Sequence, residues 1–171
     1  MKVLLVIDML NDFMRKGGGL YCGDDGRKII PFIKKKIEEC RASGCRVVYS
    51  CDAHEPEDRE FHLYSAHAIK GSEGASIIDE LSPGPRDIIV EKTTVRPFYR
   101  SRLEEVLEDL EPEEVMVTGV CTSICVMEAV AGLSVRGYKT VVYRQGAADF
   151  DKEAHETALK RMENVYGASI Q

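Results

Sequence analysis

Cys125 has the surroundings expected of a reactive thiol. It lies just inside the start of a predicted helix, in the segment Gly119-Val120-Cys121-Thr122-Ser123-Ile124-Cys125-Val126. Unpaired backbone N–H groups at a helix N-terminus stabilise negative charge and lower the pKa of a thiol. The thiolate is the nucleophilic form, and the same N–H groups could hold the oxyanion of an acyl-transfer intermediate. A buried structural cysteine is the commoner alternative, so the other reactive side chains must decide.

Asp8 and Lys92 are the charged side chains that could serve such a thiol. Asp8 directly follows an apolar segment and could take the thiol proton and later activate water. Lys92 follows another apolar segment and could stabilise the thiolate and the charge of a transition state. Each has an ordinary alternative, because aspartates often cap loops and most lysines are solvated. Beside Cys125, however, each has a charge-based reason to be there, and the three predict a nucleophile, a base and a cation.

A second group of side chains has the composition of a metal site. Asp52-Ala53-His54 is followed by His62 and His67, and the chain's other histidine, His155, is expected on the surface of the last helix. One carboxylate and two imidazoles suit Zn²⁺, Fe²⁺ or Mn²⁺ with positions left open for water or substrate. The D-x-H tripeptide is common by chance, and histidines in a polar loop are often only solvated. The pattern alone is therefore a weak prediction of metal binding.

The elements that must position these residues follow an alternating pattern. Apolar runs of strand length alternate with amphipathic helical segments, and continuous apolar strands are typical of a parallel sheet buried on both faces. We expect strands at residues 3–7, 46–50, 87–90, 115–118 and 140–143, with a short sixth near Ser169, and helices at 27–42, 102–109, 123–135 and 152–164. The predicted fold class is α/β: a three-layer doubly wound sheet, mostly parallel, of about six strands with helices on both faces, in a single domain, 1–171.

This arrangement would bring the reactive residues to one edge of the sheet. Asp8, Asp52, Lys92 and Cys125 each follow a different predicted strand. In open α/β sheets, ligands bind in the crevice beyond the carboxyl ends of the strands. The intervening segment 52–86 is long, polar and rich in Gly, Pro, Glu and His, and loops of that length in compact domains are usually functional.

Composition excludes several classes of partner. The formal net charge is −6 and the basic residues are scattered, which argues against nucleic acid and anionic membranes as partners. No apolar run approaches the ~20 residues that span a bilayer, and the apolar start is too short for a signal peptide and lacks a cleavage site. The six cysteines are therefore expected to be free thiols in a cytoplasmic protein.

The motifs together resemble the isochorismatase-like cysteine hydrolases, and among them the nicotinamidases. The resemblance covers nearly the whole chain: residues 8–13 and 17–20 are similar to D-x-Q-N-D-F and G-G-x-L, Lys92 with Pro97-Phe98 to K…S-A-F, residues 119–126 to G-x-x-T-[DE]-x-C-V, and 155–162 to the last helix. It implies that Asp8 is the base, Lys92 completes the triad, and Cys125 is the nucleophile. It also implies a cis peptide before Cys121, and an oxyanion hole made by the backbone N–H groups of Cys121 and Cys125.

The resemblance extends to the metal and substrate residues. Asp52-Ala53-His54 is similar to the nicotinamidase D-x-H pair, and residues 65–71 resemble the P-x-H-C-x-x-G segment. This implies Asp52, His54 and His67 as ligands of one divalent ion, Zn²⁺ first, with Fe²⁺ or Mn²⁺ as alternatives, and it leaves His62 out. Substrate contacts are implied for the ring of Phe13, for Tyr64 in place of a tryptophan, and for Ile124 in place of a tyrosine.

The sequence departs from the family pattern around the pocket. Leu10 replaces a glutamine, Ala53 a tryptophan, Ser123 the acid of the nucleophile motif, and Ile124 a tyrosine. The predicted nucleophile and base are intact, so the departures concern the choice of substrate and leave the hydrolytic chemistry in place.

The expected activity is an amidohydrolase that cleaves a small carboxamide through a cysteine thioester. Conversion of nicotinamide to nicotinate and ammonia is the leading case. Alternatives are another small amide, a ureido or carbamoyl acid, or isochorismate. Outside this class, a catalytically silent scaffold and a phosphoacceptor signalling domain, which also places Asp and Lys at strand ends, are the rivals. Relatives of this kind are often homo-oligomers, so self-association is expected.

Overall fold

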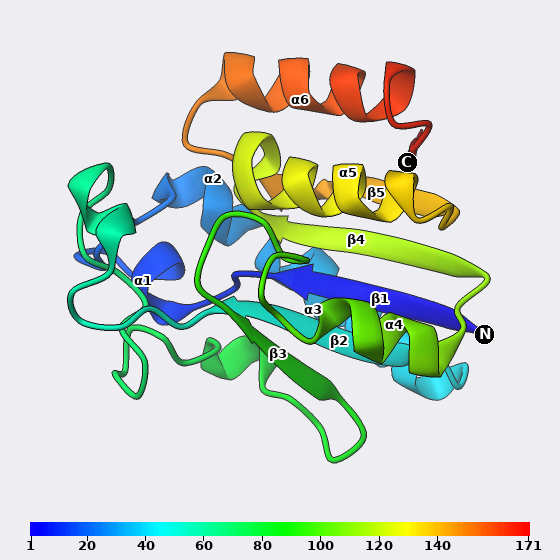
Figure 1. Cartoon of the computed structure of the whole chain (residues 1–171), viewed down its shortest axis with the longest axis horizontal. Helices are drawn as coiled ribbons and strands as arrows, with labels where there is room; N and C mark the ends of the chain where they lie inside the picture. Colours follow the sequence, from blue (N-terminus) through cyan, green and yellow to red (C-terminus); the bar gives the residue numbers. More distant parts are fainter.

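A computed structural model describes all residues, 1–171, and shows one parallel six-stranded sheet (Figure 1). The strands lie in the order β3-β2-β1-β4-β5-β6, and every neighbouring pair is parallel. Their bounds are β1 (Lys2–Ile7), β2 (Arg46–Asp52), β3 (Ile88–Lys92), β4 (Glu114–Val120), β5 (Thr140–Ala148) and β6 (Ser169–Ile170). The predicted α/β class is confirmed, and the sheet has no antiparallel strand.

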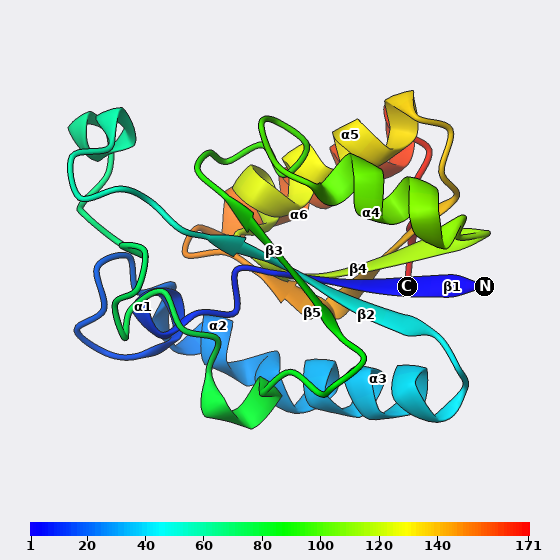
Figure 2. The same cartoon turned by 60° about the horizontal axis from the view of Figure 1, so that its bottom comes forward.

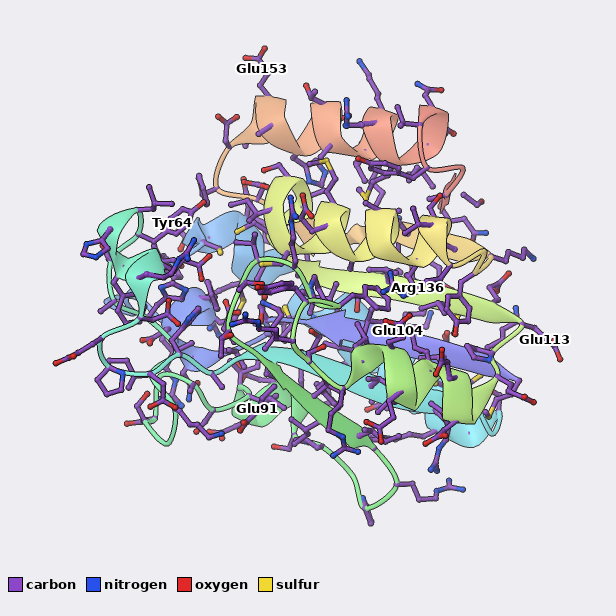
Figure 3. All side chains as sticks on the ribbon, in the orientation of Figure 1. Tyr64, Glu91, Glu104, Glu113, Arg136 and Glu153 are labelled. Atoms are coloured by element: carbon purple, nitrogen blue, oxygen red, sulfur yellow. The ribbon has the colours of Figure 1, made fainter.

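Helices cover both faces of this sheet (Figure 2). The long helix α3 (Ile30–Ala42) lies on one face together with the short α1 (Asn11–Met14) and α2 (Gly23–Lys28). The other face carries α4 (Leu103–Leu110), α5 (Met127–Val135) and α6 (Lys152–Asn164). Arg136, just after α5, ties two of these helices together by donating two hydrogen bonds to Glu104 of α4, at 2.9 and 2.7 Å (Figure 3).

The central strand β1 shows why the sheet is buried on both sides. Its residues Val3 to Ile7 are completely inaccessible to solvent. Leu4 and Val6 pack into the core beneath α3, whereas Val3, Leu5 and Ile7 pack into the core beneath α4, α5 and α6. Successive side chains of a strand point to opposite faces, so a continuous apolar run fills two cores at once.

The strand order decides between two of the expected functions. Consecutive strands run outward from β1 to β3, and the chain then crosses back to place β4 on the other side of β1. The order 3-2-1-4-5-6 puts the topological switch point between β1 and β4, whereas phosphoacceptor domains have the order 2-1-3-4-5. The phosphoacceptor alternative is therefore wrong, and the crevice for a ligand lies beyond Ile7 and Val120.

Some element bounds differ from expectation for local reasons. The helix expected at 27–42 is two helices, because Pro31 in the first turn of α3 lacks an N–H and restricts the residue before it, so the chain breaks at Ile29. The helix expected at 123–135 begins as a π-helical turn, η3 (Thr122–Val126), before α5. Strand β5 continues to Ala148, past a register shift against β4.

The long segment after β2 folds over the carboxyl end of the sheet, beside α1 (Figure 1). It contains two short 3₁₀ turns, η1 (Arg59–His62) and η2 (Asp79–Leu81). Asp12 of α1 anchors it, because its carboxylate accepts hydrogen bonds from the N–H groups of Ala68, at 2.7 Å, and Gly19, at 3.2 Å. None of the helices has the length and apolar character that crossing a membrane requires.

Candidate active site

The switch point of the sheet places Cys125 at the centre of the candidate site. Strand β4 ends at Val120, the peptide bond between Val120 and Cys121 is cis, and η3 then carries Cys125 inward, where its side chain is buried. The Cys125 Sγ lies 3.6 Å from Nζ of Lys92, the last residue of β3. The cis bond is the one that the family resemblance implies.

Lys92 joins this thiol to two carboxylates. Its ammonium group is completely buried and forms ion pairs with Asp8 Oδ2, at 2.8 Å, and with Asp52 Oδ1. Burial alone would lower the pKa of Lys92, but the carboxylates of Asp52 and Asp8 outweigh it and hold the pKa well above its ordinary value. Lys92 is therefore a permanent cation, and a charge buried this deeply persists only when it is paired.

Asp8 has the position and acidity of a general base. Its Oδ1 accepts a hydrogen bond of 2.8 Å from the Asp52 N–H, while its Oδ2 faces Lys92 without an aligned hydrogen bond. Burial and the nearby charge of Asp52 raise the pKa of Asp8 to about 6, against the opposing effect of Lys92. Its backbone has φ 50, in the left-handed region, which is uncommon for a side chain other than glycine and recurs at functional sites.

The environment of Cys125 corrects one expectation. The helix position predicts a lowered thiol pKa, but burial raises the pKa of Cys125 well above its ordinary value, and the charges of Asp8 and Asp52 raise it further. The charge of Lys92 lowers the pKa of Cys125, but by less than burial and the two carboxylates raise it. Burial therefore favours the protonated thiol, and a neighbouring base that takes its proton would favour reaction.

The three predicted metal ligands lie together beside this group. Asp52, His54 and His67 are buried, and one ligand atom of each lies within 4.8 Å of the others. The Nε2 atoms of His54 and His67 each lie 3.7 Å from an oxygen of Asp52. Burial opposes ionisation of Asp52, yet Lys92 and the two imidazoles hold its pKa well below the usual range, so it is a carboxylate.

Hydrogen bonds on the far side of each imidazole leave Nε2 as the ligating atom. His54 Nδ1 lies 3.2 Å from Asp58 Oδ2, and His67 Nδ1 lies 2.7 Å from the Ser65 carbonyl oxygen. Such contacts fix the tautomer and orientation of metal-binding histidines. His54 Nε2 is buried and has no hydrogen-bond partner in the protein, an arrangement that costs free energy unless something binds there. These residues fit a divalent cation.

Glu60 is a candidate ligand that sequence reasoning missed. Its Oε2 lies 3.4 Å from His54 Nε2, on the face of η1 that turns inward. Burial raises the pKa of Glu60, and the Asp52 charge adds to this. The only signal in the sequence is a carboxylate six residues after His54 in a polar loop, which is too common to be informative. His62, two residues later, is exposed, in agreement with its exclusion.

A mostly apolar cavity opens onto both the thiol and the metal residues. Phe13, Tyr64 and Ile124, the three predicted substrate contacts, line it together with Leu20 and Val95, and Cys125 and His67 form part of its wall. The Phe13 ring meets the His67 ring edge to face, with centroids 5.4 Å apart. Tyr64 projects from the long loop at the same end of the molecule (Figure 3). No lysine or arginine side chain lines the cavity.

The turn before the nucleophile is held by residues from the end of the chain. Asp149, just after β5, accepts two hydrogen bonds of 2.8 Å from Ser123, and His155 Nδ1 lies 2.8 Å from Thr122 Oγ1. The expectation of a surface His155 is therefore wrong, because the side chain turns inward to Thr122 and is only 18% exposed. Asp149 was not among the predicted site residues, although its place at the carboxyl end of a strand is the signal that singled out Asp8.

Comparison with known proteins agrees with this geometry. The sequence model of the isochorismatase domain matches residues 2–171. An uncharacterised isochorismatase family protein of Bacillus subtilis strain 168, PncA, is 34% identical over 179 residues, which cover 99% of this chain and 98% of that protein.

Solved structures give the same result. Nicotinamidase PncA from Bacillus subtilis has a TM-score of 0.93 and 31% identity, covering 99% of this chain and 98% of that one. N-carbamoylsarcosine amidase from Thermoplasma acidophilum has a TM-score of 0.91 and 31% identity, covering 99% and 95%. Because the match extends over the whole chain in both sequence and structure, the protein belongs to the isochorismatase family.

Proposed function

We propose that this protein is a cysteine amidohydrolase whose substrate is a small uncharged aromatic carboxamide, with nicotinamide as the leading case. The family and the fold support hydrolysis of small amides in general. The narrower proposal depends on one observation: the cavity beside Cys125 is walled by apolar side chains, has no cationic side chain in its lining, and reaches His67 and Asp52 on its other side. A flat heteroaromatic ring with one amide arm matches these features.

The chain's own residues account for the proton transfers. Asp8 Oδ2 removes the proton from Cys125 Sγ, and the thiolate attacks the amide carbon. The backbone N–H groups of Cys121 and Cys125 are the proposed oxyanion donors. Ammonia departs with the proton from Asp8, which then deprotonates the water that hydrolyses the thioester. Lys92 keeps the charge of the thiolate compensated throughout.

Asp52, His54 and His67, with Glu60 as a fourth candidate, would hold a divalent cation, Zn²⁺ first. When bound, this ion would supply a Lewis-acidic position for a ring nitrogen of the substrate. His67, in the cavity lining together with Cys125, would stand beside the substrate. Fe²⁺ and Mn²⁺ remain alternatives because the same ligands suit them.

Carbamoyl and ureido acids are the second candidate substrates, favoured by the similarity to N-carbamoylsarcosine amidase. Such acids and isochorismate carry carboxylates, which are costly to bury without a cationic partner. The cavity lining offers them no lysine or arginine, and the carboxylates of Asp52 and Glu60 leave the proposed divalent ion as the one cationic partner there. The lining therefore supports the uncharged amide. The buried Asp8, Lys92 and Asp52 beside the thiol of Cys125 support an active enzyme over a silent scaffold, which the ammonia-release test below separates.

Ammonia release from a panel of amides tests the proposal. The panel contains nicotinamide, pyrazinamide, N-carbamoylsarcosine and ureidoacrylate, each with and without added Zn²⁺ or Fe²⁺. Turnover of the first two amides, raised by metal, is the expected result. Turnover confined to the carboxylate-bearing amides would contradict the choice of substrate, and no release from any amide would contradict amidohydrolase activity.

A further inference from the structure

We infer that Asp149 and His155 are positioning residues that fix the turn carrying the nucleophile. This inference rests on the proposed function, because it concerns the placement of Cys125 for the same reaction. The group formed by Thr122, Ser123, Asp149 and His155 is called the nucleophile clamp below. Its members come from two regions of the chain: Ser123 and Asp149 are 26 residues apart in sequence, and Thr122 and His155 are 33 apart.

Asp149 acts as the cap that η3 lacks. The residue at the start of η3, Cys121, provides no side-chain cap for the turn. Instead, one oxygen of Asp149, Oδ2, accepts from both the backbone N–H and the hydroxyl of Ser123, each at 2.8 Å. Asp149 is 5% exposed, so these bonds are shielded from water. A carboxylate that satisfies the free N–H groups of a first helical turn stabilises that turn as an N-cap would.

His155 holds the adjoining residue. Thr122, completely buried, shares a hydrogen bond of 2.8 Å with His155 Nδ1. His155 is itself fixed in the first turn of α6, where its N–H donates to the Asp151 carbonyl oxygen at 2.9 Å. Both residues between Cys121 and Ile124 are thus fastened to the segment that follows β5. Two residues further along the same turn is Cys125.

The charge of Asp149 opposes the reaction, so the role of the nucleophile clamp is geometric. The Asp149 carboxylate places negative charge at the same helix N-terminus where the thiolate and the oxyanion must form, so it does not assist them electrostatically. What it supplies is the direction of the Cys125 side chain toward Lys92 and Asp8. A displacement of about 1 Å in a reacting group can reduce a rate on the order of 100-fold, which gives such a clamp a function.

The structure also identifies a compensating pair. The family motif carries an acid where this chain has Ser123, and in this chain the carboxylate of Asp149 lies against that position. Exchanging the two residues, Ser123→Asp with Asp149→Ser, keeps one carboxylate and one hydroxyl at the same contact. The exchange should therefore rescue what Asp149→Ser alone loses.

The test compares kcat, KM and Cys125 alkylation across these variants, using nicotinamide or whichever amide of the panel is turned over. Asp149→Ala and Thr122→Val are expected to lower kcat about 10- to 100-fold with little change in KM. Asp149→Asn, which keeps an acceptor oxygen, and the exchanged pair are expected to recover most of that loss. The matched control is Asp87→Ala, which removes another shielded carboxylate that accepts from a backbone N–H, that of Gly84, at the opposite end of β3, and should lower Tm without lowering kcat.

Iodoacetamide alkylation, followed by mass spectrometry of the Cys125 peptide, reads the clamp without any substrate. The rate of Cys125 alkylation at a fixed pH should fall in Asp149→Ala, because the thiol no longer faces Asp8 and Lys92, and should return in the exchanged pair, while the half-exposed Cys45 serves as the internal reference. Unchanged kcat and an unchanged alkylation rate in Asp149→Ala would overturn the clamp. A loss that tracks Tm and that neither Asp149→Asn nor the exchange restores would overturn it too. If wild-type protein hydrolyses no amide, the proposed function fails, and alkylation still tests the clamp.

Discussion

The side chain of Lys92 is the residue on which the candidate site depends most. It is a fully buried cation between two buried carboxylates, with the thiol of Cys125 as its third neighbour. Ion pairs on the surface contribute little, but removal of one member of a buried set leaves the others uncompensated. The same charge that serves the chemistry therefore also serves the fold.

Lys92→Met is expected to lower the free energy of unfolding by about 3–5 kcal/mol, because Asp8 and Asp52 lose their shared counter-ion in the interior. Urea unfolding at neutral pH measures this. The control is Lys70→Met, which removes an exposed pair with Glu91 and should cost less than about 1 kcal/mol. Equal losses of stability in the two variants would contradict the proposal that Lys92 is the shared counter-ion of Asp8 and Asp52.

Substitutions of the two cysteines in the nucleophile segment are expected to have clearly different effects on activity. Cys125→Ala should abolish ammonia release, because the attacking atom is removed. Cys121→Ala should retain most activity, because the proposed contribution of Cys121 is its backbone N–H, which the substitution preserves. Steady-state kinetics on purified variants measures both. Comparable losses would contradict the assignment of Cys125 as the nucleophile.

At the scale of elements, the long loop after β2 completes a site that the sheet alone only begins. Strand β2 ends in Asp52, while His54, Glu60 and His67 all come from the loop. The loop is held in place by Asp12 of α1 and by a bridge between His54 and Ile69. The metal residues are therefore positioned by packing between the loop and α1.

One divalent ion per chain is expected, and His67→Ala should reduce its occupancy strongly because a buried ligand is lost. His62→Ala is the matched control, since His62 lies in the same loop but is exposed. Elemental analysis after dialysis against equimolar Zn²⁺ measures occupancy. A similar reduction in both variants, or metal-free protein with activity that chelators leave unchanged, would contradict the predicted ligand set.

Glu114 joins the amino ends of neighbouring elements. Its carboxylate forms ion pairs with Lys139 and Lys2, each at 2.7 Å. Hydrogen bonds from these two lysines lower the pKa of Glu114 in the folded protein. A lowered folded pKa contributes stability that is present above the ordinary value of about 4.3 and is lost as pH falls through the folded value.

Glu114→Gln is therefore expected to destabilise the protein at pH 7, with a difference from wild type that shrinks as pH falls below about 4. Denaturant midpoints across this pH range measure the effect. A difference that stays constant with pH would show that the carboxylate charge does not contribute.

At the scale of the whole molecule, the fold was the part that sequence patterns predicted best. The uninterrupted apolar run of Val3 to Ile7 favours a strand buried on both faces, and the alternation with helices then favours parallel neighbours. The predicted strand 140–143 was shorter than β5. Exposed Arg144 and Gln145 interrupt the apolar run, while the backbone still pairs with β4 up to Ala148. Tertiary pairing determined the end of that strand.

Site residues that directly follow a strand could be predicted from the sequence. Contacts that depend on tertiary packing were harder to predict. Asp8, Lys92 and Cys125 were indicated by position alone. The raised pKa of Cys125 was missed, because position in a helix carries no information about burial or about two neighbouring carboxylates. Glu60 was missed because its contact with His54 depends on a loop conformation that sequence spacing does not reveal, whereas Asp149 follows a strand as Asp8 does and was overlooked.

The separation of the two ends of the sheet has a consequence for how this chain tolerates change. Asp8, Asp52, Lys92 and Cys125 lie at or after the carboxyl ends of four different strands, whereas the connections that enter the strands, such as residues 111–113 ahead of β4, carry none of the site residues. Insertions, new chain termini or fusion partners at those entering connections should leave the reacting atoms undisturbed. Equivalent edits at the opposite edge would fall next to the reacting atoms, so this architecture makes the entering connections the safer places for insertions.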